Sequence, residues 1–142
     1  MNGFDGKTEQ GGNLDTYDPI DNSWTSVSFL ADGESGPGPR SVSALLPVHG
    51  SRSTLLITLF GESDPSTLGH KGAGKMLSDV WAYCIENRTW TRLVTTNKDV
   101  PLGRGWFDAD TVQLDGRDAV IVVGGLGENN DRLDDAWLLT FE

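Results

Sequence analysis

The chain has few of the residues on which disulfide-bonded, nucleic-acid-binding and membrane proteins depend. Among its 142 residues there are one cysteine, two histidines and 11 lysines and arginines, against 21 aspartates and glutamates. A single cysteine excludes an internal disulfide. The formal net charge of −10 argues against nucleic acid and anionic membranes as partners, because both carry negative charge.

Long apolar runs are also lacking. No stretch has the length of a membrane span or of a signal peptide, and residues 1–4 carry no basic side chain. We therefore expect a cytoplasmic protein without membrane contact. No Ser-His-Asp or Cys-His set is present, and Cys84, beside Tyr83 in an expected strand, is predicted to be a buried small hydrophobic residue rather than a nucleophile.

An internal repeat dominates what is present. Tyr17 precedes Trp24 by seven residues, and Tyr83 precedes Trp90 by seven residues, 66 positions later. Further matches, at offsets of 64 or 56, are Arg40 with Arg104, Phe60-Gly61 with Gly124-Gly125, and Asp79-Val80-Trp81 with Asp135-Ala136-Trp137. Such periodicity predicts an array of similar supersecondary units.

The repeated unit is predicted to consist of strands. Residues 53–60 and 119–123 are short apolar runs, rich in β-branched residues and bounded by Gly, Ser or Asp, as in strands buried on both faces. Residues 80–83 and 89–93 alternate more strongly, and Glu86-Asn87 between them favours a hairpin turn. No window has apolar residues at helical spacing, so we expect an all-β protein.

The order of these features resembles the kelch repeat, which forms one four-stranded blade of a β-propeller. The resemblance covers essentially the whole chain and implies an all-β, kelch-type β-propeller fragment of about two and a half blades. Its parts would be a partial blade over residues 1–30, a blade over 40–95 with an inserted loop at 62–78, and a last blade over 101–142 without its outer strand.

The length is small for a closed propeller. Six blades of about 50 residues each would need about 300 residues, whereas this chain has 142. An open array exposes unpaired strand edges, which favour association. We therefore expect either a truncated product, or self-association, or a companion chain that completes the propeller.

The inserted loop holds the residues best suited to bind a metal. Glu62, Asp64 and His70 lie within nine residues, and loops on rigid scaffolds often carry binding residues. Two carboxylates and one imidazole are a ligand set that suits non-haem Fe²⁺, although Mn²⁺ or Zn²⁺ would also accept it. The alternative is a solvated acidic loop without a metal.

Several motifs make the chain similar to the C-terminal half of the nitrile-specifier and thiocyanate-forming kelch proteins. They are Gly61-Glu62, Gly69-His70, Gly72-Ala73-Gly74, Arg104-Gly105-Trp106 and residues 130–135. The resemblance implies Fe²⁺ bound by Glu, Asp and His spaced four residues apart, and lyase-like diversion of an unstable glucosinolate-type aglucone to a nitrile. Glu62 and His70 keep this spacing, but Ser66 stands in the middle position, so Asp64 is the nearest carboxylate.

Arg40 and Arg104 each precede the first strand of a unit, a position that faces the central cavity of a propeller. Two guanidinium groups there could bind a sulfate, phosphate or carboxylate, and the resemblance implies a sulfated substrate. The alternative is structural, because kelch arginines often bind carbonyl groups of a neighbouring blade. Trp106 follows Arg104 closely and could line the same cavity, whereas Trp24 and Trp90 are predicted to pack between blades.

Two functions of different classes remain open. One is an Fe²⁺-dependent specifier protein that acts on a small anionic substrate. The other is a non-catalytic kelch module or propeller fragment that binds a protein partner, a reading favoured by Ser66 at the middle ligand position and by the short chain. Loss of metal binding on substitution of Glu62 or His70 would separate the two.

Overall fold

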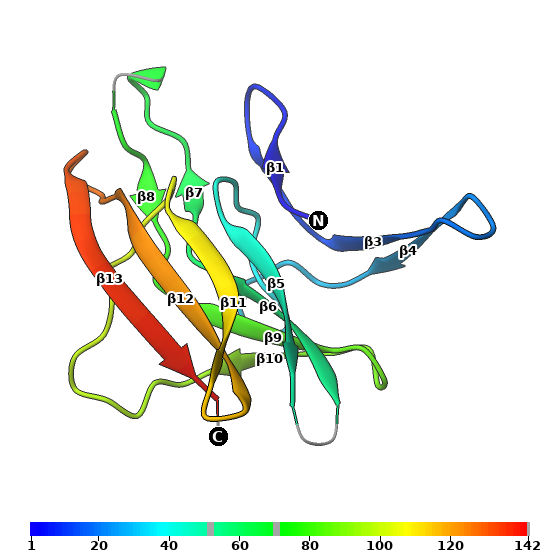
Figure 1. Cartoon of the computed structure of the whole chain (residues 1–142). Helices are drawn as coiled ribbons and strands as arrows, with labels where there is room; N and C mark the ends of the chain where they lie inside the picture. Colours follow the sequence, from blue (N-terminus) through cyan, green and yellow to red (C-terminus); the bar gives the residue numbers. More distant parts are fainter. Residues whose placement is uncertain (51–52, 70–71, 142) are drawn as a thin grey trace.

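The chain folds into antiparallel strands and turns (Figure 1). The computed structural model describes residues 1–50, 53–69 and 72–141, and these contain no α-helix. The strands are β1 (Gly3–Phe4), β2 (Glu9–Gln10), β3 (Asn13–Asp18), β4 (Ser23–Ser28), β5 (Ala44–His49), β6 (Thr54–Leu59), β7 (Glu62–Asp64), β8 (Lys75–Met76), β9 (Val80–Cys84), β10 (Thr89–Leu93), β11 (Asp108–Leu114), β12 (Arg117–Leu126) and β13 (Arg132–Thr140). The predicted all-β class is confirmed.

The strands form two larger sheets and three hairpins. One sheet has the order β10-β9-β6-β5 and the other β11-β12-β13, while β1–β2, β3–β4 and β7–β8 pair on their own. No sheet closes on itself within the described residues. The strands predicted at 53–60, 80–83, 89–93 and 119–123 correspond to β6, β9, β10 and β12.

The hydrophobic core lies between the two larger sheets. Ile57 and Leu59 of β6 and Val120 and Val122 of β12 all have an exposed fraction of 0 % and belong to one cluster. β6 and β12 are also hydrogen-bonded along both edges. Thr58 and Ala119, which point to the opposite faces of these strands, are 0 % and 1 % exposed. This position explains the nearly continuous apolar sequence of the two runs.

The repeat extends to unusual backbone conformations. Val42 and Trp106, 64 residues apart, have φ angles of 47° and 50°, and a β-branched residue in this region is a clear outlier. Gly61 has a φ of 103°, and a Cβ built on it would lie 2.5 Å from the carbonyl oxygen of Ser41. Only glycine therefore fits at the end of the apolar run of this unit.

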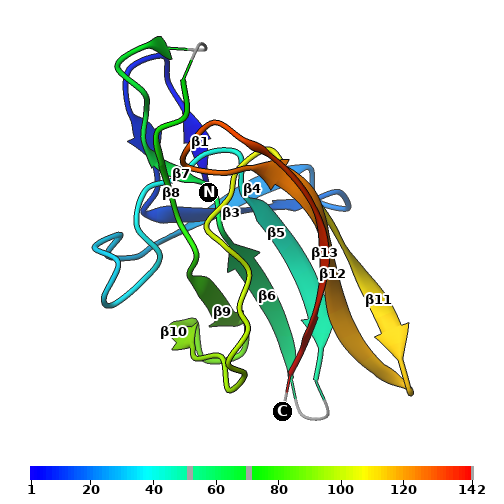
Figure 2. The ribbon, with the colours of Figure 1, turned by 90° about the vertical axis from the view of Figure 1, so that its left-hand side faces the viewer.

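Two hairpins lie together at one end of the molecule. β1–β2 and β7–β8 project side by side beyond the larger sheets (Figure 2), whereas β3–β4 points away from the sheets (Figure 1). No helix in the described part of the chain is long and apolar enough to cross a membrane.

The two tryptophans predicted to pack between blades differ. Trp90 packs between the rings of Tyr83 and Phe29, with centroid distances of 5.0 Å and 5.2 Å. Trp24 contacts Tyr17 at 5.0 Å but is 70 % exposed, so the prediction of buried packing is wrong for this residue. The reason is that β3–β4 is a hairpin on its own, whereas β9–β10 belongs to a four-stranded sheet.

Cys84 is less buried than predicted. The thiol is half-buried rather than buried, because Cys84 is the last residue of β9 and lies beside the turn to β10. Its Sγ lies 3.2 Å from Oε2 of Glu86. The side chain therefore contacts a polar turn instead of the core.

Candidate functional site

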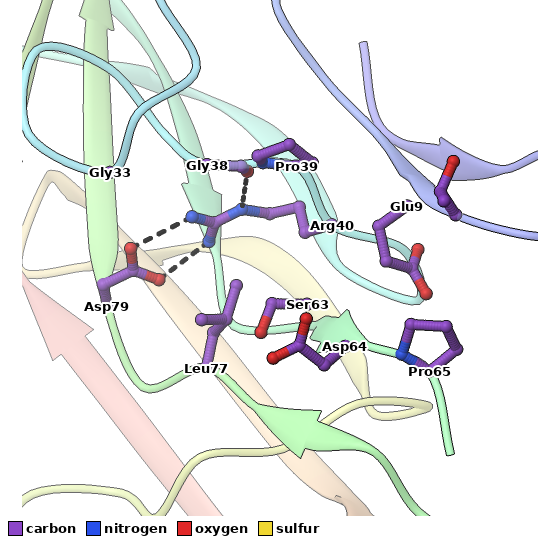
Figure 3. Close-up of a pocket in the computed structure, with 11 residues that line it drawn as sticks. Glu9, Gly33, Gly38, Pro39, Arg40, Ser63, Asp64, Pro65, Leu77 and Asp79 are labelled. Atoms are coloured by element: carbon purple, nitrogen blue, oxygen red, sulfur yellow. Dashed lines mark hydrogen bonds and ion pairs between the residues drawn. The ribbon is translucent and has the colours of Figure 1, made fainter. Parts of the chain in front are cut away.

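A buried ion pair fixes the start of the four-stranded sheet. The Arg40 guanidinium donates from Nη1 and Nη2 to the two oxygens of Asp79 at 2.8 Å and 3.0 Å, as Figure 3 shows. Nη1 also donates to the carbonyl of Phe60, and Nε donates to the carbonyl of Gly38, both at 3.1 Å. The Trp81 indole donates to Asp79 at 2.6 Å. We call Arg40, Asp79 and Trp81 the first clasp.

The same arrangement recurs in the three-stranded sheet. Arg104 donates to both oxygens of Asp135 at 2.6 Å and 2.9 Å, and to the carbonyls of Gly124 and Leu102 at 2.9 Å and 3.1 Å. The Trp137 indole donates to Asp135 at 2.6 Å. Hydrogen bonds from Arg104 outweigh burial and lower the pKa of Asp135 to about 2. Arg104, Asp135 and Trp137 form the second clasp.

In both clasps, the guanidinium group of the arginine is buried and its hydrogen-bond donors are used within the protein. Both Arg40 and Arg104 are 0 % exposed, and Nε, Nη1 and Nη2 of each donate to protein oxygens. A ligand could reach either guanidinium only by displacing an ion-pair partner. Both arginines thus hold parts of their own unit together, whereas the structural alternative expected from the sequence was binding to carbonyl groups of a neighbouring blade.

A cleft of about 810 Å³ lies beside the hairpins β1–β2 and β7–β8. Trp106, 47 % exposed, is on its wall together with Val42. The exposed side chains of Lys7 and Arg132 line the same cleft and are its described cationic groups. We call this the main cleft; it also contains Phe4, Glu9, Ser41, Glu62, Pro65, Ser66, Thr67, Leu126 and Asn130.

A second pocket of about 390 Å³ lies between β1–β2 and the first clasp. Figure 3 shows Asp64 and Glu9 among its lining residues, with the Arg40–Asp79 pair at the opposite side. Glu62 lines the main cleft and not this pocket. The pairing of β7 with β8 shifts register between Glu62 and Asp64, at the place where the two predicted ligands separate.

The predicted metal ligands are therefore only partly described. His70 lies outside the described residues. Within residues 1–50, 53–69 and 72–141, no group of three His, Cys, Asp or Glu side chains has the arrangement of a metal site. Glu62 lines the main cleft and Asp64 lines the smaller pocket. Asp64 is therefore not a second carboxylate of the main cleft.

Glu62 is a buried carboxylate at the main cleft, 6 % exposed. Its Oε1 accepts a hydrogen bond from the backbone N–H of Gly74 at 2.5 Å. A Cβ on Gly74 would overlap the carbonyl oxygen of Asp64 and would lie 2.5 Å from the same Glu62 oxygen. Only glycine therefore fits at position 74, where its backbone N–H reaches the Glu62 carboxylate.

Glu9 is a second buried carboxylate, which no sequence pattern indicated. It is 8 % exposed and lines both pockets, and neither carboxylate oxygen has a hydrogen-bond partner in the described structure. Burial raises its pKa, the nearby Ser41 hydroxyl lowers it without reaching hydrogen-bond geometry, and the charge of Glu62 raises it further. In the sequence Glu9 stands among polar residues and resembles part of a solvated turn.

The fold and the site define a class, an all-β chain of repeated antiparallel units with two buried carboxylates at a cleft. No family model matches the chain. It is similar to N-(sulfonatooxy)prop-2-enimidothioate sulfolyase of Thlaspi arvense, with 28 % identity over 121 residues. The match covers 85 % of this chain and 33 % of the relative, so the chain spans about a third of that protein's length. This similarity supports a distant relation to that sulfolyase.

Proposed function

We propose that the chain is part of a kelch-type β-propeller protein with specifier activity. Its substrate would be an unstable glucosinolate-type aglucone, an N-sulfonatooxy imidothioate, which the protein diverts from isothiocyanate to nitrile. The observation that carries this proposal is the similarity to the Thlaspi arvense sulfolyase over 85 % of the chain. Fold likeness without such a relative would not indicate a substrate.

The sheets support the propeller part of the proposal. The order β10-β9-β6-β5 gives four antiparallel strands, as in one blade, and β11-β12-β13 gives three. The core between the two sheets corresponds to the packing of neighbouring blades. The greater length of the relative leaves room for further blades in such a protein.

The main cleft is the proposed substrate site. A sulfate group would contact Lys7 and Arg132, whose exposed cationic side chains line the cleft. Trp106 would pack against the organic part of the substrate. Arg40 and Arg104 were the sulfate ligands expected from the sequence, but that role would require opening both clasps, so Lys7 and Arg132 are the better donors.

Ferrous iron is the proposed cofactor, and the residues fit it in part. Glu62 is suited to hold the ion, because it presents a buried carboxylate at the cleft and the neighbouring Glu9 oxygens lack partners. Asp64 and His70 were the other ligands expected from the sequence; Asp64 lines the smaller pocket and is not placed in the proposed iron site. When bound, the ion supplies a Lewis acid and a template that orients the substrate sulfur.

A non-catalytic interaction module is the second candidate. The β3–β4 hairpin leaves Ile20 and Trp24 exposed at 91 % and 70 %, as expected of a surface that another protein covers. Ser66 at the middle ligand position also favours this candidate. Under it, the chain would bind a protein and would not change the fate of an aglucone.

A product assay separates the two candidates. A glucosinolate is hydrolysed by a thioglucosidase with the purified chain present, with and without Fe²⁺ under anaerobic conditions, and nitrile and isothiocyanate are measured by gas chromatography. Specifier activity predicts an Fe²⁺-dependent rise in the nitrile share, reduced by the double variant Lys7→Ala/Arg132→Ala. Isothiocyanate alone, from a chain whose circular dichroism shows that it is folded, would reject specifier activity and leave the interaction module.

A further inference from the structure

Backbone hydrogen bonds identify equivalent places in successive units. The bond from Gly3 N–H to Arg40 O (2.9 Å) matches the bond from Gly61 N–H to Arg104 O (2.8 Å). The bond from Arg40 N–H to Gln10 O (3.1 Å) matches the bond from Arg104 N–H to Leu77 O (3.2 Å). Gln10 therefore occupies the place of Leu77. Glu9, one residue earlier, occupies the place of Met76.

Glu62 has an equivalent of the same kind. It exchanges two backbone hydrogen bonds with Ser41, both at 3.0 Å, just as Leu126 exchanges two with Gly105, at 2.7 Å and 3.0 Å. Glu62 therefore occupies the place of Leu126. Both carboxylates stand where the following unit has a buried apolar side chain, since Met76 is 6 % and Leu126 is 8 % exposed.

Carboxylates at such positions are costly for stability. Burial removes water from Glu9, and its two oxygens gain no hydrogen bond from the described residues. A methionine or leucine, as in the following unit, would stabilise the same place by apolar burial. Glu9 and Glu62 also repel each other when both are ionised. A positive partner between them would remove both penalties.

We propose that Glu9 and Glu62 bind one divalent cation between them. The two residues come from neighbouring strands, β2 and β7, and both line the main cleft. Two carboxylates offer the oxygen donors that Mn²⁺, Mg²⁺ and Fe²⁺ accept. Glu9 thereby supplies the second carboxylate that Ser66 does not provide. The inference deepens the proposed function, on which it rests for iron as the natural cation.

Binding of Mn²⁺ alone tests the site without any substrate. The full chain is titrated with Mn²⁺, and free Mn²⁺ is followed by electron paramagnetic resonance, for the wild type and for Glu9→Gln, Glu62→Gln and Asp64→Asn. We expect Glu9→Gln and Glu62→Gln to weaken binding about tenfold or more, and the matched control Asp64→Asn to change it less than about twofold. Anaerobic Fe²⁺ should displace the bound Mn²⁺.

Thermal unfolding provides a second readout that a purely structural role would not produce. Without metal, Glu9→Gln should melt at a higher temperature than the wild type, because it removes an unpartnered buried charge. With Mn²⁺, the wild type should gain stability, and Glu9→Gln should not. A variant that lost binding by misfolding would instead melt at a lower temperature in both conditions.

Three outcomes would overturn the inference: a folded wild type that binds no Mn²⁺, Glu9→Gln binding as tightly as the wild type, or loss of binding in Asp64→Asn alone. Glu9 would then be a carboxyl group whose pKa is raised by burial and which has no role in cation binding. Failure of the proposed function looks different. Mn²⁺ bound through Glu9, with no nitrile formed in the product assay, would keep the cation site and reject specifier activity.

Discussion

The two clasps have the same hydrogen bonds but different surroundings. Arg40 and Arg104 are both fully buried, whereas their partners differ, with Asp79 at 12 % and Asp135 at 36 % side-chain exposure. Asp79 precedes β9, which lies between two strands, and Asp135 lies in β13, which has one neighbouring strand in the described sheet. Repetition of sequence thus reproduces the geometry of the ion pair, while the neighbouring strands decide how strongly water competes with it.

The pKa values of Asp79 and Asp135 are both lowered, but by different balances of burial and hydrogen bonding. At Asp79, burial is the largest influence and raises the pKa, but the hydrogen bonds and charge of Arg40, with smaller contributions from the Trp81 hydrogen bond and the charge of Arg92, lower it overall. At Asp135, the hydrogen bonds from Arg104 are the largest influence and the pKa falls to about 2. Desolvation is therefore a major cost in the first clasp and a secondary one in the second.

Removal of the first arginine should have the largest effect. Arg40→Ala leaves Asp79 buried without its cation, so we expect the free energy of unfolding to fall by about 3–5 kcal/mol. Urea unfolding followed by circular dichroism measures this change. If Arg40→Ala is too unstable to fold, Arg40→Lys, which keeps the charge but loses the paired hydrogen bonds, should lie between it and the wild type. A loss of less than about 1 kcal/mol would show that the pair contributes like an exposed one.

The matching change in the second clasp should cost less. Arg104→Ala leaves Asp135 partly in contact with water, and we expect a loss of about 2–3 kcal/mol, between the values for exposed and buried pairs. The same urea experiment gives the number. A loss equal to or larger than that of Arg40→Ala would reject the view that exposure of the aspartate separates the two clasps.

The tryptophans allow a finer comparison. Trp81→Phe removes an indole N–H that donates to an ionised carboxylate in a side chain 1 % exposed, so we expect a loss of about 1.5–3 kcal/mol. Trp137→Phe removes the same bond from a half-buried side chain and should cost less. Equal losses for both variants would mean that the hydrogen bond, and not the burial around it, sets the contribution.

The smallest expected effect is on the dependence of stability on pH. The folded-state pKa of Asp135, about 2, lies below its ordinary value of about 3.9. Its stabilising contribution is therefore complete above about pH 4 and is lost as the pH falls through the folded-state value. Urea midpoints measured from pH 5 to pH 2 should fall less steeply in Arg104→Ala than in the wild type. An unchanged slope would contradict the view that Asp135 of the second clasp causes this pH dependence of stability.

Much of the fold follows from local sequence patterns. The apolar runs at 53–60 and 119–123 became the central strands β6 and β12, and the Tyr–Trp repeat marked two real hairpins. The repeat offset also placed Arg40 and Arg104 in equivalent positions. What it could not assign was their partners, because Asp79 and Asp135 are 39 and 31 residues away and only folding brings them together.

The sequence by itself determined the strand pattern, the glycine at position 61 and the matching places of Arg40 and Arg104 in the repeat, because each is carried by the side-chain size, β propensity or backbone freedom of a few neighbouring residues. The tertiary structure alone decided that Trp24 is exposed, that Glu62 and Asp64 line different pockets, and that Glu9 lies beside Glu62 although 53 residues separate them. The physical reason is that burial and charge proximity are properties of packed elements. The same carboxylate is an ordinary turn residue in water and a candidate cation ligand once β2 packs beside β7.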